Sequence, residues 1–243
     1  FLCTREEISY HLDTPCTWTS FTLWHLLKNA KSNGIKVVMT GDGADEIFGG
    51  YSRYLLLDHD EKIRNIQVMK QYGFMIDRYY GSSAERYARL VNRYEDSYNT
   101  VVKQYTEEQV QKYLDNSNGQ IVHGMGMHDF YTTMQVLLQM GDRMSMAFSI
   151  ENRSPFLDYR LVEFAFSMPE RYKINNGIAK WALKEVARKF IPAEIVDRAD
   201  KRGFSAPVNK WFQWDKAGKY DRNGYKQLAY SDWKTVFNVK NAP

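Results

Sequence analysis

A short apolar run followed at once by an acidic, glycine-rich turn is the feature that most constrains how this chain folds. Residues 35–39 are largely apolar and β-branched, and Gly34 precedes them. A run of this kind, bounded by turn residues, predicts a buried strand of a parallel sheet. The chain then turns through Gly41 and Gly43, and helix-forming residues resume at Ala44. This order of strand, turn and helix is typical of an α/β layer.

Three carboxylates crowd the turn, because Asp42, Asp45 and Glu46 fall within five positions. In an open parallel sheet, ligands bind outside the carboxyl ends of the strands. Like charges at such short range repel each other unless cations or a proton neutralise them. Mg²⁺ is often held by one or two carboxylates together with substrate phosphates. We therefore favour a functional turn over a solvated one whose carboxylates only complement the dipole of the following helix.

The rest of the chain is predicted to be mostly helical. Thr19 or Ser20 can cap a helix that precedes the strand and ends near Gly34. Helical spacing and capping residues predict further helices over 59–80, 84–94, 106–114, 127–148, 158–165 and 179–190, and a short one near Trp211. No second convincing strand follows, so the rest of the sheet is expected to come from before Phe1.

Two charged residues, Asp142 and Arg143, interrupt an apolar helical stretch. Buried charges need partners. One interpretation is an internal ion-pair network of Arg143, Glu151, Arg153 and Asp158. The other assigns charged residues to a ligand site, because helix ends and charged loops can face the cleft above a sheet. We favour the ligand site for Asp142 and Arg143, and both interpretations stay open for Glu151 and Asp158.

A basic loop over 198–205 is the third group of charged residues, with Gly203 close to Lys201. Phosphate binding uses Lys as a mobile point charge and Arg as a planar fork. A short basic run alone is usually a solvated loop, but an acidic turn elsewhere in the chain favours phosphate binding. Lys180 and Lys184 lie four apart on one predicted helix face, which is most often a solvent face.

Composition excludes several classes of function. The net charge of +4 in 243 residues is too small and dispersed to indicate nucleic-acid binding. No apolar run approaches the roughly 20 residues that cross a membrane. The two cysteines, Cys3 and Cys16, favour a reducing compartment, and we expect a cytoplasmic protein. The sequence begins with Phe1 and has no signal-peptide pattern, so we expect a piece of a longer protein.

Four blocks in this order resemble the synthetase domain of glutamine-hydrolysing asparagine synthetases and relatives such as β-lactam synthetase. The resemblance covers about residues 9–211. Its blocks are Gly41-Asp42-Gly43-Ala44-Asp45-Glu46-Ile47-Phe48-Gly49-Gly50-Tyr51, Asp142-Arg143-x-Ser145-Met146-Ala147, Glu151-x-Arg153-x-Pro155-Phe156-Leu157-Asp158 and Lys201-x-x-Phe204-Ser205.

The resemblance implies an ATP-dependent ligase that releases AMP and pyrophosphate. Family members adenylate a carboxylate with ATP and Mg²⁺, and an amine then attacks the acyl-adenylate. In asparagine synthetases the carboxylate is that of aspartate, and the amine is ammonia from glutamine. The implied fold is an ATP-pyrophosphatase-like α/β fold, of which this chain supplies a minor part of the parallel sheet, at 35–51, and a helical C-terminal region. We expect this part to span 1–217, with a polar tail over 218–243.

The resemblance also implies roles for single residues. Asp42 matches the carboxylate that takes a proton from the attacking amine, and Asp45 matches a ligand of Mg²⁺–pyrophosphate. Lys201 matches the lysine that stabilises charge on the α-phosphate. The remaining candidates, for binding ATP or pyrophosphate, are Gly41, Gly43, Asp142, Arg143 and Lys180.

The chain departs from the family pattern in two ways. Well-studied asparagine synthetases carry Glu where Asp42 stands, and Asp is one methylene shorter. The Ser-Gly-Gly-x-Asp-Ser pyrophosphate loop and the glutaminase domain with its N-terminal cysteine do not occur in this sequence. We expect both upstream of Phe1 as partner segments, expect the isolated chain to be inactive, and regard a homodimer as compatible with the sequence. The alternatives are a relative that amidates another carboxylate and a binding module that has lost catalysis.

Overall fold

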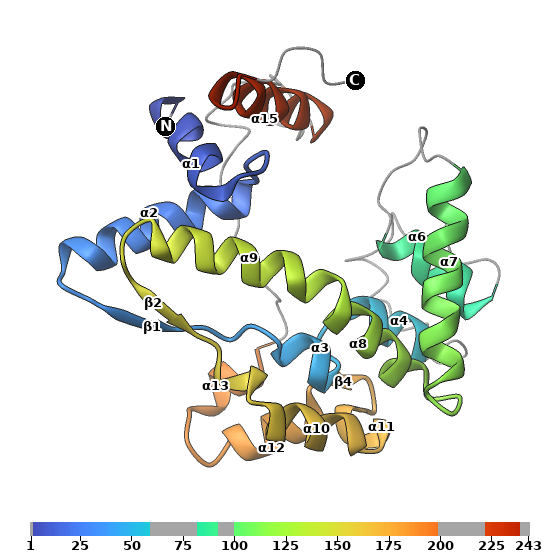
Figure 1. The fold of residues 1–243 in the computed structure, drawn as a ribbon. Coiled ribbons are helices and arrows are strands. Elements are labelled where there is room, and N and C mark those ends of the chain that lie inside the picture. Colours follow the sequence, from blue (N-terminus) through green and yellow to red (C-terminus); the bar gives the residue numbers. More distant parts are fainter. Residues whose placement is uncertain (1, 59–81, 92–99, 199–221, 239–243) are drawn as a thin grey trace, which may run out of the picture. The chain divides into compact units, whose positions relative to one another are not determined.

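The structure is a computed structural model that describes residues 2–58, 82–91, 100–198 and 222–238 (Figure 1). The predictions for 59–80, for the helix near Trp211 and for Lys201 fall outside these residues. The chain divides into two compact units. The first unit takes its described residues from Phe1–Thr40, Val136–Arg153 and Ala199–Pro243, and the second unit from Gly41–Gln135 and Ser154–Arg198.

Most of the described residues are helical, with a few short strands, so the chain has a mostly helical α/β structure. None of the described helices is long and apolar enough to cross a membrane. In chain order the elements are α1 Leu2–Leu12, α2 Trp18–Ser32, β1 Val37–Met39, α3 Ala44–Phe48, α4 Ser52–Asp58, α6 Ser83–Val91, α7 Thr100–Asp115, α8 Ile121–Tyr131, α9 Thr133–Met146, β2 Glu151–Arg153, the 3₁₀ turn η2 Pro155–Leu157, α10 Tyr159–Ser167, α11 Glu170–Lys173, β3 Ile174–Asn175, β4 Ile178–Ala179, α12 Trp181–Ala187, α13 Ala193–Val196 and α15 Arg222–Val236.

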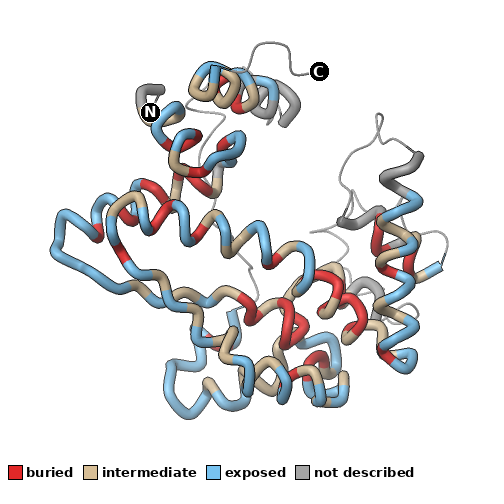
Figure 2. The backbone as a smooth tube through the Cα atoms, in the orientation of Figure 1, coloured by how far each residue is buried: buried red, intermediate tan, exposed pale blue. Residues whose placement is uncertain are grey.

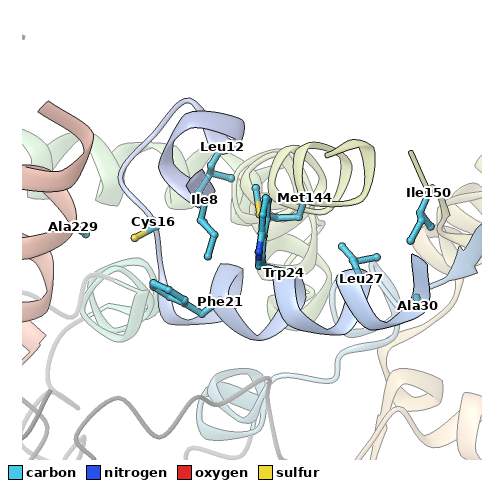
Figure 3. Packing of buried hydrophobic residues seen from close by; sticks show 10 residues of the cluster. All are labelled: Ile8, Leu12, Cys16, Phe21, Trp24, Leu27, Ala30, Met144, Ile150 and Ala229. Carbon is cyan, nitrogen blue, oxygen red and sulfur yellow. The ribbon is translucent and has the colours of Figure 1, made fainter. Parts of the chain in front are cut away.

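Helix α2 supplies most of the core of the first unit, as predicted from its apolar spacing. Phe21, Trp24 and Leu27 are each at most 2% exposed, and they face one side of the helix (Figure 3). The N-cap is Thr17 rather than the predicted Thr19 or Ser20, because its hydroxyl accepts a hydrogen bond from the Ser20 amide. The Ser20 hydroxyl caps the Thr17 amide in return, which completes a capping box.

The predicted parallel strand is present as β1, but its partner corrects the sequence analysis. Glu151–Arg153, read as part of a charged segment, forms β2 and pairs with β1 in parallel, with Val37 opposite Glu151. The prediction of a buried strand is wrong for the described residues, because Val37 is 41% and Met39 75% exposed. Parallel strands are normally covered on both faces, and only one neighbouring strand is described here.

Helices α1 and α15, the first and the last elements that the structure describes, pack against each other in the first unit. Arg5 on α1 and Asp232 on α15 form an ion pair of 2.9 Å across 227 positions of sequence. Ile8 and Ala229 are buried in the same apolar cluster as Trp24. Helix α15 therefore forms within the segment 218–243 that was predicted as a polar tail.

The second unit is built around α8, which contacts α3, α4, α7 and α11. Figure 2 shows buried residues along α8 and α3. Met125 of α8 is fully buried in one apolar cluster with Tyr54 and Tyr87, and Ile47 of α3 is fully buried in another. The turn motif is thus followed by a short helix that is anchored in the core of this unit.

Several helix boundaries differ from those predicted. The long helix expected over 127–148 is two helices, α8 and α9, which break at Thr132. Thr106 lies inside α7, which begins at Thr100, so it does not cap that helix. Asp158 caps α10 as predicted, because its carboxylate accepts a hydrogen bond from the Arg160 amide.

Candidate functional site

The three carboxylates of the acidic turn have different environments. Asp42 is half-buried, and Asp45 has a side chain that is 26% exposed. Glu46 is buried, with 2% exposure. Helix α3 begins directly after Gly43, which has a φ of +89°. The cluster expected from the sequence is therefore not one acidic surface, because Glu46 points into the protein.

Asp45 makes an ion pair with Lys180, which lies more than a hundred positions further along the chain. The Lys180 ammonium nitrogen is 2.9 Å from an Asp45 carboxylate oxygen, and the two side chains are 27% and 26% exposed. The sequence predicted both residues as site candidates, and the structure brings them together. A carboxylate and an ammonium side by side provide one group for a metal and one for an anion.

A short hairpin places Lys180. Strands β3 and β4 pair antiparallel, and Asn176 and Gly177 connect them with φ values of +48° and +77°. Positive φ at both central residues is typical of the tight hairpin turn that Asn-Gly favours. Lys180 follows β4 with φ +55°, in the left-handed region. For a residue other than glycine this costs about 1–3 kcal/mol, and such conformations cluster at functional sites.

Gly50 leaves room for the ion pair. A Cβ atom at this position would lie 2.0 Å from the Asp45 carboxylate oxygen and 2.1 Å from the Lys180 Cε. Its amide donates a hydrogen bond of 2.8 Å to the Asp45 carbonyl oxygen. The glycine after the short helix therefore brings its backbone directly against the two charged side chains, where no other residue fits.

The buried side chain of Glu46 is held by a hydrogen bond within the second unit. Its carboxylate accepts a hydrogen bond of 2.6 Å from the Tyr51 hydroxyl. Burial raises the pKa of Glu46, and this hydrogen bond acts against the increase. Burial also raises the pKa of the Tyr51 hydroxyl, with the Glu46 charge as the second cause, so the hydroxyl stays a donor. The sequence analysis did not select Tyr51, although it ends the turn motif.

Asp142 and Arg143 lie on α9 within the first unit, and both are exposed. Neither makes an ion pair within the ranges that the structure describes. The ion-pair network considered as an alternative does not form around Arg143. Instead, Glu151 pairs with Arg153 at 2.9 Å.

Asp158 pairs with Arg160 at 2.8 Å rather than joining such a network. Arg160 lowers the pKa of Asp158 to about 2 through side-chain and backbone hydrogen bonds. Asp158 therefore caps the start of α10. The proximity of Asp142 and Arg143 to the acidic turn stays a prediction, because they belong to the other unit.

In the described ranges, no group of three or more His, Cys, Asp or Glu side chains is arranged to hold a metal ion. Two carboxylates of the turn, those of Asp42 and Asp45, are partly exposed and could bind a metal ion. A site of one or two carboxylates suits Mg²⁺ that is also bound by phosphate oxygens and water. It does not suit a metal that requires a closed protein cage.

Sequence comparison identifies relatives of this chain. A family model described as asparagine synthase matches residues 1–236. Glutamine-hydrolysing asparagine synthetase 1 of Bacillus subtilis is 29% identical over 85% of this chain and 36% of its own length. A putative glutamine-hydrolysing asparagine synthetase of Mycobacterium bovis is 26% identical over 88% of this chain and 36% of its own length.

A shorter match to asparagine synthetase 3 of Arabidopsis thaliana is 36% identical over 75 residues, which is 28% of this chain. The chain spans about 36% of the length of the bacterial relatives that it matches. The family model, by contrast, covers all but the last few residues of the sequence. The chain therefore belongs to the asparagine synthase family.

Proposed function

We propose that this chain is part of an ATP-dependent, AMP-forming amide ligase that converts aspartate to asparagine. In the first step a carboxylate oxygen of aspartate attacks the α-phosphorus of ATP, and pyrophosphate leaves. In the second step ammonia derived from glutamine attacks the acyl carbon, and AMP leaves. Membership of the asparagine synthase family supports this reaction class, and the naming of the relatives as glutamine-hydrolysing asparagine synthetases supports asparagine as the product and glutamine as the nitrogen source.

The observation that carries the proposal is the Asp45–Lys180 pair. Both side chains are about one quarter exposed, so each can exchange its partner for a ligand. The Lys180 ammonium then binds pyrophosphate oxygens as a point charge. The Asp45 carboxylate is released to hold Mg²⁺. The backbone of Gly50 lies directly against both side chains.

Mg²⁺ fits the donor set of the turn, since carboxylate oxygen is its usual protein ligand. When bound, the ion neutralises charge on the phosphate oxygens. Asp45 holds the ion, and Asp42 takes a proton from the attacking amine. The amides around Gly41 and Gly43 face the nucleotide in this proposal.

The other assigned residues act on the phosphates and complete the site. Lys201 stabilises negative charge on the α-phosphate, and Asp142 and Arg143 bind the nucleotide. These assignments rest on the family resemblance and on residue chemistry. Positioned charge of this kind is usually the largest catalytic term in phosphoryl and acyl transfer.

We propose an ATP-pyrophosphatase-like fold for the complete protein, with further strands beside β1. The exposure of Val37 and Met39 supports this proposal, because parallel strands are normally covered on both faces. The relatives are nearly three times longer than the matched region, which leaves room for a pyrophosphate loop and a glutaminase domain. A cytoplasmic location and a homodimer belong to the same proposal.

The test is ATP–pyrophosphate exchange by the full-length protein with aspartate and Mg²⁺. Asp45→Asn should lower the exchange rate by about 10²–10³-fold, the scale for loss of one preorganised charged group. Lys180→Met should weaken the binding of pyrophosphate. Arg188→Met is the matched control, because Arg188 pairs with Asp197 at 2.5 Å on the surface of the same unit, and exchange should persist.

The carboxylate substrate is tested in the same assay. Exchange with another carboxylate but not with aspartate would identify a relative that amidates a different substrate. Absence of exchange with every carboxylate, in a protein that still binds ATP, would identify a binding module. Equal loss of exchange in the Asp45 and Arg188 variants would remove the support for the Asp45–Lys180 site.

A further inference from the structure

Glu46 and Tyr51 close a short loop that begins directly after Asp45. The hydroxyl of Tyr51 donates to the Glu46 carboxylate at 2.6 Å, and Glu46 is 2% exposed. The loop between them contains Gly50, whose backbone lies against Asp45 and Lys180. A buried carboxylate requires donors, and Tyr51 supplies one from a side chain. The position of the loop is therefore tied to a hydrogen bond whose acceptor is buried.

Tyr51 is itself held by an ion pair that is largely buried. The guanidinium carbon of Arg53 lies 3.8 Å from the centre of the Tyr51 ring, a cation–π contact. Arg53 in turn contacts the carboxylate of Asp129 at 2.5 Å, and Asp129 is fully buried on α8. The phenol of Tyr51 is thus fixed through its ring as well as through its hydroxyl.

Helix α8 also reaches Glu46 by a second and independent contact. A Cβ atom at Gly126 would lie 2.6 Å from the carbonyl oxygen of Glu46, so α3 and α8 approach closely there. Asp129 lies three positions later on the same helix. The backbone and the side chain of Glu46 are therefore both fixed by contacts that lead to α8.

We infer that Tyr51 and Glu46 are positioning residues for Asp45, which they hold in the geometry that binds the metal–phosphate group. The inference rests on the proposed function. Neither residue touches substrate in this account. Their effect comes from preorganisation: a turn that is already fixed loses little entropy when the ligand binds, and small displacements of a charged group are costly.

The sharpest variant is Tyr51→Phe in the full-length protein, because it keeps the ring beneath Arg53 and removes only the donor to Glu46. We expect the Mg²⁺ concentration that gives half-maximal ATP–pyrophosphate exchange to rise roughly tenfold, the scale for loss of a hydrogen bond to a charged group. The maximal rate at saturating Mg²⁺ should change much less. If Tyr51 contributed only to stability, Tyr51→Phe would lower the melting temperature but would not raise the Mg²⁺ requirement more than it changes the maximal rate.

Tyr54→Phe is the matched control. Tyr54 is fully buried, and its hydroxyl donates to Asp129 rather than to Glu46. Loss of the Tyr54 hydroxyl should lower the melting temperature and leave the Mg²⁺ requirement of exchange unchanged. Glu46→Gln, which keeps an acceptor for Tyr51, should stay closer to the wild-type Mg²⁺ requirement than Glu46→Leu.

A second measurement does not depend on turnover. The Gly50 amide donates to the Asp45 carbonyl oxygen, and its hydrogen-exchange rate reports whether the loop stays closed. Tyr51→Phe should speed exchange in the peptide 44–51 roughly tenfold, whereas Tyr54→Phe should not. The inference would be overturned if the wild type is active and Tyr51→Phe changes neither the Mg²⁺ requirement nor the slow hydrogen exchange of peptide 44–51. That result would leave the proposed function intact. A wild type without exchange activity would remove the proposed function and with it the positioning role, even if the loop is held as described.

Discussion

The ammonium nitrogen of Lys173 lies 4.7 Å from the centre of the Phe166 ring, and no hydrogen-bond partner for it occurs among the described residues. Lys173 is 1% exposed. Burial lowers the pKa of Lys173 to about 8, and the charge of Glu170 offsets only part of that effect. The His123 imidazole on α8 also faces this ammonium, and its own pKa is lowered by burial and by Lys173. The second unit therefore carries a buried cation without a direct counterion.

Lys173→Met should stabilise the protein at pH 7. The folded-state pKa of about 8 lies below the usual value of 10.5. Stability from this group is thus fully present above pH 10.5 and is lost as the pH falls towards 8. Each pKa unit is worth 1.36 kcal/mol, so the gain at pH 7 should approach roughly 3 kcal/mol.

Urea unfolding of both proteins at pH 7 and pH 10 measures this effect. The wild type should gain stability between the two pH values relative to Lys173→Met. The exposed Lys189 provides the control, because Lys189→Met should leave the pH dependence unchanged. A Lys173→Met protein that is less stable than wild type at pH 7 would show that the amine makes a favourable interaction.

Gly50→Ala should remove exchange activity in the full-length protein. The added Cβ would come within 2.1 Å of both the Asp45 carboxylate oxygen and the Lys180 side chain, so one of them must move. We expect a loss of at least about tenfold in ATP–pyrophosphate exchange, since small displacements in a site are costly. Gly119→Asn, at a position with open space around it, should have no effect on exchange.

Asp129→Asn should destabilise the second unit strongly. Burial alone would raise the pKa of Asp129, but His128, the Arg53 charge and the Tyr54 hydroxyl outweigh it and hold the pKa at about 2. The amide leaves the partly buried Arg53 beside a neutral partner, and the loss of one partner of a buried pair typically costs about 3–5 kcal/mol. Thermal and urea unfolding measure this cost. Asp197→Asn, which breaks a surface pair, should cost less than about 1 kcal/mol.

Thr17→Ala should cost about 1 kcal/mol, because it removes the N-cap of α2. Thr19→Ala lies inside the helix and should cost much less, since alanine is the better helix former. Unfolding by urea distinguishes the two variants. A larger cost for Thr19→Ala than for Thr17→Ala would return the N-cap to the position expected from the sequence.

Local patterns in the sequence predicted the elements that depend on local physics. The apolar spacing of Phe21, Trp24 and Leu27 predicted α2, and the carboxylate of Asp158 predicted the start of α10. Such signals act within one or two helical turns, so they are visible in a short window. The apolar run at 35–39 also predicted a parallel strand, which forms over Val37–Met39, although its partner and its exposure were not predicted.

Features that depend on distant segments were missed. Strand β2 consists of Glu151, Asn152 and Arg153, whose side chains have little strand propensity, and its pairing comes from backbone hydrogen bonds to β1. The pairing of Asp45 with Lys180 joins two segments that no periodicity connects. The β3–β4 hairpin could have been found, because Asn176-Gly177 is a strong signal for a two-residue turn. The inward orientation of Glu46 had no comparable signal, since its neighbours Asp45 and Asp42 have the same chemistry.

The first unit is built from segments that lie on both sides of the second unit in the sequence, and this affects the order in which the two units can fold. Strand β1 is complete by Met39, but its partner begins at Glu151, so residues 41–135 of the second unit are synthesised between them. The pairing of Arg5 with Asp232 closes a loop of 227 positions. Contacts of such long range form late, because closing a long loop costs conformational entropy before the contact can stabilise the chain. The apolar face of α2 therefore stays without its α9 partner on the ribosome until the second unit has largely emerged, and the first unit should depend on chaperones during synthesis more than the second.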